Sequence, residues 1–174
     1  MKPVAADRAR GMKLLSCMLA ACALGAAPAA HAGEKADLVL VEKGRHLLSL
    51  YKSGKLLASF RVSFGGDPVG PKQKEGDGKT PEGRYVLDYR RTDSGYYKAF
   101  HVSYPDAKDR ERAKQAGVSP GGAIMIHGQK NGWGWASAVT QKFDWTKGCI
   151  AVSNRDMNAL WQAVDAGTPI EIRP

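Results

Sequence analysis

Short segments in which apolar and polar side chains alternate restrict the fold of this chain most strongly. In residues 56–64, the apolar side chains of Phe60, Val62 and Phe64 alternate with polar ones. A period of two places alternate residues on opposite faces of an extended strand, which is the pattern of a half-buried β-strand. Comparable short segments recur along the chain, and together they predict a mainly β fold.

These segments predict a β-hairpin and six further strands. Residues 46–51 and 56–64 flank residues 52–55, and a short connection that contains Gly between two strand segments favours a hairpin. Residues 65–83 are rich in Gly, Pro and Lys and predict a long loop. The other predicted strands are residues 38–41, 84–89, 100–104, 123–127, 150–152 and 170–172.

Two helices are predicted between the strands. Residues 106–116 are charged and compatible with a helix that ends at Gly117. A second helix is expected to begin at Ser153, which has the spacing of a capping box with Asp156. Its apolar residues recur at helical spacing and form one face, which consists of Met157, Leu160, Trp161 and Val164.

The first 32 residues are typical of a secretory signal peptide. A basic start is followed by an apolar stretch over residues 14–27 and by Ala30-His31-Ala32, a small-residue cleavage site before Gly33. The apolar stretch is shorter than the about 20 residues that cross a bilayer, so no transmembrane span is expected. The sequence therefore predicts an exported, periplasmic protein with one domain over residues 33–174.

Cys22 offers an alternative to ordinary cleavage. Residues 19–22 (Leu-Ala-Ala-Cys) resemble the lipobox of bacterial lipoproteins, in which the cysteine is acylated. Acylation at Cys22 would change how the protein is anchored and not its chemistry.

Removal of a signal peptide would leave a single cysteine, Cys149, because Cys17 and Cys22 both lie in the first 32 residues. Exported proteins usually pair their cysteines, since their compartment is oxidising. A lone cysteine in such a protein is either a buried small hydrophobic residue or a reactive thiol.

The charge balance is basic. The net charge is +9, and residues 1–32 contribute four Lys and Arg against one Asp, which leaves +6 for residues 33–174. This charge suits an anionic wall or membrane surface. No arginine-rich run favours nucleic acid as a partner. No convincing ligand spacing among Cys149, His127 and His101 predicts a metal site.

His127 is the best candidate to activate the Cys149 thiol. A thiol attacks as its thiolate, so Cys149 needs a base, and His127 ends the most apolar predicted strand, where its ring would project at a strand-to-loop junction. His46 and His101 are expected to be structural, and Asp77 to be a solvated loop residue. Backbone N–H groups at residues 147–149 could receive an oxyanion. From these residues alone, a packing role for Cys149 and a hydrogen-bonded strand-end role for His127 remain alternatives.

Four motifs in a fixed order resemble the L,D-transpeptidase (YkuD-type) catalytic domain family. Residues 126–128 (Ile-His-Gly) and 146–150 (Thr-Lys-Gly-Cys-Ile) are similar to its His-Gly strand end and its Ser/Thr-His-Gly-Cys motif. Residues 80–83 (Thr-Pro-Glu-Gly) resemble its entry into a central strand, and residues 119–122 (Ser-Pro-Gly-Gly) its approach to the histidine strand. The resemblance covers residues 38–174.

This resemblance implies a β-rich fold with two sheets and one or two helices. It also implies that a thiolate attacks the diaminopimelate carbonyl of a peptidoglycan tetrapeptide stem, releases D-Ala and passes the acyl group to an amine or water, without a cofactor. Peptidoglycan stem peptides, and a wall-attached protein as a further candidate, would be the partners. By position, the roles would fall to Cys149 as nucleophile, His127 as base, Gly128 as the carbonyl that orients the histidine, and Trp145, Thr146, Lys147 and Gly148 on the oxyanion and substrate side.

Lys147 departs from the family pattern, which usually has histidine at this position. A lysine could lower the pKa of the neighbouring thiol or bind a carboxylate, but it is not an imidazole acid-base. A hydrolase of the same domain, either an L,D-carboxypeptidase or an amidase, and a wall-binding module without catalysis are therefore alternatives. Trp133, Trp135 and Trp145 either form a lid or a wall for the substrate or pack on the sheet. Asn154 is the nearest polar candidate beyond the motif.

Overall fold

The strands pair into one mixed sheet of eight in the computed structural model, which describes Met1 and residues 33–174. The sheet order is β3-β2-β1-β8-β4-β5-β6-β7. The mainly β class is confirmed. The strands are β1 (Leu38–Glu42), β2 (Leu47–Lys52), β3 (Lys55–Arg61), β4 (Gly83–Arg91), β5 (Ala99–Val102), β6 (Met125–His127), β7 (Ile150–Ala151) and β8 (Thr168–Arg173).

The sheet curls until its two edge strands approach each other. The chain beyond β3 pairs with β7, because Ser63 and Ala151 exchange two backbone hydrogen bonds of 2.9 and 2.8 Å. The neighbours β1/β8 and β6/β7 are parallel, and the other pairs are antiparallel. Where the resemblance implies two sheets, the structure has a single hydrogen-bonded sheet that folds back on itself.

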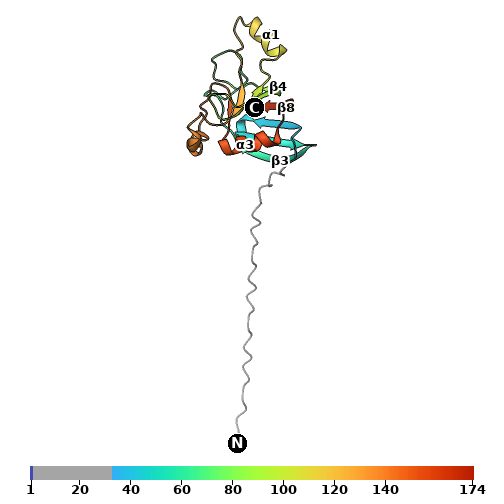
Figure 1. Cartoon of the computed structure of the whole chain (residues 1–174), viewed down its shortest axis with the longest axis vertical. Helices are drawn as coiled ribbons and strands as arrows, with labels where there is room; N and C mark the ends of the chain where they lie inside the picture. The colour runs from blue at the N-terminus through green and yellow to red at the C-terminus, as the bar shows by residue number, and fades with distance from the viewer. Residues whose placement is uncertain (2–32) are drawn as a thin grey trace.

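The inner face of this sheet forms the core. Val39 and Val41 of β1 and Leu48 and Leu50 of β2 lie inside it, all fully buried. Helix α3 (Asn154–Ala163) covers this core with the face that its apolar periodicity predicts (Figure 1). The Ser153 hydroxyl accepts a hydrogen bond from the Asp156 N–H at 3.0 Å, which confirms the predicted helix start.

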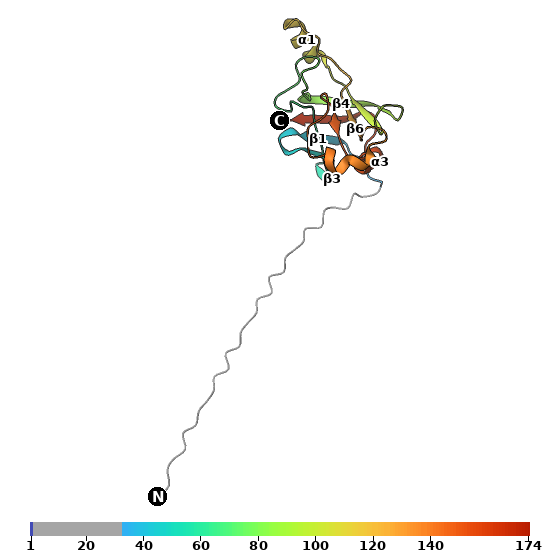
Figure 2. The same cartoon turned by 90° about the vertical axis from the view of Figure 1, so that its left-hand side faces the viewer.

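Helix α1 (Ala107–Gln115) lies at the end of the domain away from α3 in both views (Figures 1 and 2). Asp106 and Asp109 form a capping box at its start, and the Tyr85 hydroxyl donates to the Asp109 carboxylate at 2.9 Å. A third helix, α2 (Ser137–Thr140), follows the 3-10 turn η2 (Gly134–Ala136), and a further 3-10 turn, η1 (Lys43–Arg45), joins β1 to β2. Helix α2 was not predicted because four residues are too few to show a helical period.

No helix in residues 33–174 has the length and apolar character needed to span a membrane. The predicted signal segment, with Cys17 and Cys22, lies outside the described residues apart from Met1.

Candidate active site

His127 ends strand β6 and is held by its own backbone. Its side chain is buried, and Nδ1 lies 2.6 Å from the carbonyl oxygen of Gly128. A carbonyl can only accept, so Nδ1 carries the proton and Nε2 keeps a free lone pair. The Gly128 carbonyl therefore orients the imidazole and leaves its other nitrogen able to take a proton. Gly128 itself fits closely, because a Cβ there would lie 2.7 Å from the Tyr97 carbonyl oxygen.

Cys149 stands one residue before β7, on the strand next to His127. Strands β6 and β7 are parallel, with Ile126 opposite Ile150 and His127 opposite Ala151. Side chains alternate along a strand, so the two isoleucines enter the core while Cys149 and His127 share the other face as diagonal neighbours. The Cys149 thiol is partly buried, and its Sγ lies 3.7 Å from the carbonyl oxygen of Ala123.

Burial favours the neutral forms of both side chains. It lowers the pKa of His127 below its ordinary value, against a smaller opposing effect of the Gly128 hydrogen bond. It raises the pKa of the Cys149 thiol, although the backbone N–H of Met125 and the charge of Lys72 act in the opposite direction. Cys149 therefore rests as a thiol and His127 as a neutral imidazole.

The Thr146 side chain closes the turn that carries Cys149. Its hydroxyl donates to the Cys149 carbonyl at 2.8 Å and accepts from the Gly148 N–H at 3.1 Å. Gly148 has φ of +119°, and a Cβ there would lie 2.6 Å from the Lys79 carbonyl oxygen, so this position requires glycine. Thr146 and Gly148 thus shape the turn from within.

The backbone N–H groups of Lys147 and Cys149 remain available for an oxyanion. Thr146 already occupies the Gly148 N–H, whereas neither neighbouring amide has a hydrogen-bond acceptor within residues 33–174. The Lys147 side chain is exposed and forms no ion pair with a described residue. Of the three backbone N–H groups that were expected to receive an oxyanion, that of Gly148 is therefore already occupied.

Two aromatic rings enclose the imidazole. The Tyr96 ring lies over that of His127 at 4.2 Å between centroids, and the Trp145 ring meets it edge-on at 5.9 Å. Trp145 was expected on the substrate side and does lie at the site, whereas Tyr96 was missed. A single tyrosine in a polar loop gives no signal in the sequence, because its contact depends on how the loop folds back onto β6.

Asn154 and Gln129 fasten the segment that follows the histidine. The Asn154 side-chain oxygen accepts from the Gln129 N–H at 2.8 Å, so Asn154 lies at the start of α3 and also holds the site. Gln129 is fully buried; its amide donates to the Val152 carbonyl at 2.8 Å and accepts from the Thr140 hydroxyl at 2.6 Å. Gln129 was not recognised from the sequence, since these partners come from two separate segments, residues 152–154 and Thr140.

Comparison with known proteins decides the family. The model of the YkuD family, described as the L,D-transpeptidase catalytic domain, matches residues 36–172. This chain belongs to the L,D-transpeptidase catalytic domain family. YafK of Escherichia coli strain K12 is 32% identical over 132 residues, which are 72% of this chain and 46% of that protein. The chain therefore spans about half the length of the curated relatives that it matches.

Solved structures of other proteins share the fold. Pgp2, the helical cell shape determining protein of Campylobacter jejuni, superposes with a TM-score of 0.61 at 28% identity, over 80% of this chain and 48% of Pgp2. Bd1075 of Bdellovibrio bacteriovorus gives a TM-score of 0.58 at 24% identity, over 84% of this chain and 50% of that one. An L,D-transpeptidase from Mycobacterium smegmatis gives 0.53 at 16% identity, over 80% and 59% of the two chains.

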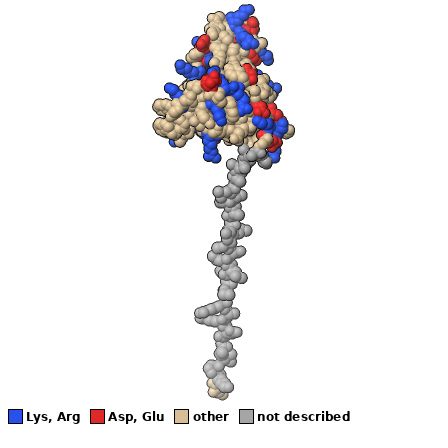
Figure 3. Space-filling model, viewed as in Figure 1, with Lys and Arg blue, Asp and Glu red and all other residues tan. Residues whose placement is uncertain are grey.

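The segment between His127 and Cys149 carries two exposed tryptophans in this L,D-transpeptidase family member. Trp133 is 53% exposed and Trp135 79%, and their rings stack with centroids 6.0 Å apart. Packing on the sheet, one of the two expected alternatives, is therefore wrong for both. The segment with α2 projects from the left of the domain in Figure 1, and Figure 3 shows this projection as largely uncharged.

The other two histidines in residues 33–174 have carboxylate partners. His46 Nε2 lies 2.9 Å from Asp144 Oδ2, and His101 Nδ1 lies 2.7 Å from Asp88 Oδ1. Within residues 33–174, no group of three or more His, Cys, Asp or Glu side chains could hold a metal ion.

Proposed function

We propose that this protein is an exported peptidoglycan L,D-transpeptidase that uses Cys149 as its nucleophile and His127 as its general base. The observation that carries the proposal is the placement of both side chains on one face of adjacent parallel strands, with the Gly128 carbonyl holding the proton on Nδ1. Membership of the L,D-transpeptidase family supports the reaction class. A tetrapeptide stem of peptidoglycan would be the donor.

In this mechanism, His127 Nε2 takes the thiol proton while Sγ bonds to the diaminopimelate carbonyl carbon. The carbonyl oxygen becomes an oxyanion and accepts hydrogen bonds from the free N–H groups of Lys147 and Cys149. Collapse of the adduct breaks the C–N bond, and the imidazolium gives its proton to the departing D-Ala amine. An acceptor amine then attacks the thioester with His127 again as base, which restores the thiol.

Product analysis tests the reaction. Disaccharide-tetrapeptide would be incubated with the protein and analysed by mass spectrometry, with Cys149→Ala and His127→Gln beside the wild type and His101→Gln as the matched histidine control. We expect cross-linked dimers and free D-Ala from the wild type and His101→Gln, and neither product from the two site variants. If tripeptide forms without dimers, the reaction is hydrolysis and not transfer. If the wild type forms no more product than Cys149→Ala, a wall-binding module without catalysis is favoured.

Export is the second part of the proposal, and it rests on the signal-like pattern of residues 1–32 and on a substrate that lies outside the cytoplasm. Cell fractionation of the full chain should recover a protein that starts at Gly33 in the periplasm. Retention in the membrane that depends on Cys22, tested with Cys22→Ala, would instead establish lipid anchoring.

The Trp133–Trp135 pair is proposed to form a wall that the bound substrate covers. Both rings are exposed, and Gly134 between them packs against Asn154, where an added Cβ would lie 2.6 Å from the side-chain nitrogen. The pair is thus fixed to a residue that also holds Gln129, next to the catalytic segment. Trp135→Ala should raise KM for tetrapeptide several-fold with kcat nearly unchanged, and an unchanged KM would remove the substrate role.

A further inference from the structure

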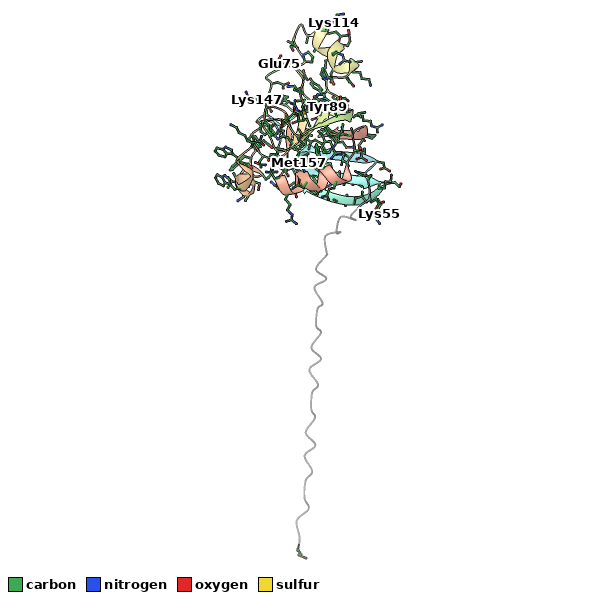
Figure 4. The ribbon with its side chains drawn as sticks, in the orientation of Figure 1. Lys55, Glu75, Tyr89, Lys114, Lys147 and Met157 are labelled. Atoms are coloured by element: carbon green, nitrogen blue, oxygen red, sulfur yellow. The ribbon has the colours of Figure 1, made fainter. Side chains whose placement is uncertain are left out.

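A cavity lies beside the turn that carries Cys149. Its volume is about 320 Å³, and its lining comes from the loop before β4, the turn before β6 and the cysteine turn, namely Lys72, Glu75, Gly76, Gly121, Gly122 and Lys147. Lys147 is two residues from the cysteine, and Gly122 precedes Ala123, whose carbonyl contacts Sγ. Figure 4 shows Glu75 and Lys147 on the same side of the molecule. The cavity therefore adjoins the thiol.

Lys72 places a fixed positive charge in the wall of this cavity. Its side chain is only 3% exposed, and Nζ donates to Asp77 Oδ1 at 2.8 Å and to the Lys74 carbonyl at 3.0 Å. An ammonium group has three N–H donors, so one remains for a ligand. Asp77 was expected to be solvated, and this expectation is wrong: its side chain is 7% exposed and also accepts from the N–H groups of residues 73, 74 and 79.

Lys147 adds a second cation that has no partner in the described part of the chain. The opposite wall consists largely of glycine, and Gly121 lies so close to Glu75 that a Cβ would meet its Cα at 3.2 Å. Backbone without side chains lets a ligand approach closely. Glu75 is the one acid in the lining, and Ser119 fixes it through a hydroxyl hydrogen bond of 3.1 Å and a backbone hydrogen bond of 2.8 Å.

We propose that this cavity binds a carboxylate of the substrate, with Lys147 as its direct ion-pair partner and Lys72 as the fixed cation behind it. The inference rests on the proposed function, because a stem with its scissile carbonyl at Cys149 carries carboxylates on either side of that carbonyl. The two that are fewest bonds from it belong to the terminal D-Ala and to the side chain of diaminopimelate. Lysine at position 147 therefore contributes substrate binding where the family usually has histidine.

Binding of three stem peptides to the Cys149→Ala protein tests this proposal without turnover. The probes are disaccharide-tetrapeptide, its C-terminal D-Ala amide and its diaminopimelate amide, each titrated by calorimetry. We expect one of the two amidations to weaken binding about tenfold, the size of one charge-assisted contact. The amide that binds weakly identifies which carboxylate enters the cavity.

Lys147 variants in the same Cys149→Ala background complete the test. Lys147→Ala should weaken binding of the free tetrapeptide and abolish its higher affinity relative to the weakly bound amide. Lys147→Arg should keep most of this difference in affinity. Lys142 is an exposed lysine outside the cavity, so Lys142→Ala should leave all three affinities unchanged. Equal binding of all three peptides, or an equal loss for all three in Lys147→Ala, would overturn the proposal. Lys147 is exposed, so substitutions there leave the buried Lys72–Asp77 pair intact, and we expect the variants to fold.

This outcome is separate from that of the proposed function. If the free carboxylate binds selectively but the wild type releases no D-Ala, the carboxylate site is supported and the reaction is refuted. Release of D-Ala by the wild type with equal binding of the three peptides would keep the reaction and refute the site.

Discussion

The Gly128 carbonyl determines which nitrogen of His127 can act as a base. Because Nδ1 is committed to that carbonyl at 2.6 Å, the free lone pair lies on Nε2. Burial acts on both members of the pair in the direction of neutrality, since it lowers the pKa of His127 and raises that of Cys149. The site is thus distinguished from cysteine enzymes that store a thiolate beside an imidazolium.

Alkylation of Cys149 should reveal this neutral resting state. We expect the rate with iodoacetamide to be low at neutral pH and to keep rising above about pH 8.5, the pKa of a free cysteine, because burial raises the pKa of this thiol. The rate would be measured from about pH 5 to about pH 10 by mass spectrometry of the Cys149 peptide. A high plateau that already begins near the acid end would show a preformed thiolate and contradict this assignment.

Thr146 should affect catalysis through the shape of the turn. Thr146→Val keeps the volume of the side chain but removes the hydroxyl that bonds the Cys149 carbonyl and the Gly148 N–H. Two hydrogen bonds of about 1 kcal/mol each are lost, so kcat for D-Ala release should fall by about tenfold or more while KM changes little. Thr146→Ser retains the hydroxyl and should stay near wild type, whereas equal kcat in both variants would exclude a positioning role.

Helix α3 serves both the core and the site. Its apolar face buries Met157 and Leu160, and its first residue, Asn154, holds the backbone of Gln129 after the histidine. The helix start is therefore a point at which stability and site geometry are coupled.

Loss of the α3 cap should destabilise the whole domain. Ser153→Ala removes the hydroxyl that accepts from the Asp156 N–H, and such a loss costs about 1 kcal/mol. Urea unfolding followed by circular dichroism would measure the change, with Ser137→Ala as the control, since the Ser137 side chain caps nothing and a surface change should stay within about 0.5 kcal/mol. Equal effects of both substitutions would show that the cap contributes nothing specific.

Two ion pairs with buried lysines anchor the long loop before β4. Lys72 and Asp77 are joined at 2.8 Å with exposed fractions of 3% and 7%, and Lys43 meets Glu82 at 2.7 Å with 3% and 17%. A buried cation without its partner is costly, so each pair fixes the course of this loop.

Acid should destabilise the domain through Asp77. Burial alone would raise the pKa of this carboxyl, but hydrogen bonds from Lys72 and from three backbone N–H groups lower it well below its ordinary value. Its contribution to stability is therefore complete above about pH 4, the pKa of an unfolded aspartate, and is lost as the pH falls toward the folded value. Urea midpoints of the wild type should accordingly decrease below about pH 4.

Asp77→Asn should lose this contribution at every pH. Because it leaves the Lys72 charge buried without its partner, it should cost about 3–5 kcal/mol at neutral pH and show a flatter acid dependence than the wild type. Asp67→Asn breaks only an ion pair in which Asp67 is 56% exposed, and should cost less than about 1 kcal/mol. Equal costs for the two variants would mean that burial of the Lys72 pair is unimportant.

Local patterns explain what could be predicted from the sequence. The alternating strands, the Ser153 cap and the His127-Gly128 strand end depend on neighbours within a few residues, so they were visible in the chain. Tyr96 over His127 and the burial of the Lys72–Asp77 pair depend on loops that meet only after folding. The single curled sheet was equally hidden, because each strand pattern defines a buried face but not the strand's neighbour.

The pairing of Ser63 with Ala151 has a consequence for the order of folding. This pairing joins segments far apart in the chain and flanks β7, so the strand after Cys149 is held on one side by β6 and on the other by the end of the first hairpin. Contacts between distant segments form late because loop closure must come first. A nascent or partly folded chain would therefore display its cysteine without the architecture that makes it reactive, and catalytic competence would arise only when the sheet has closed.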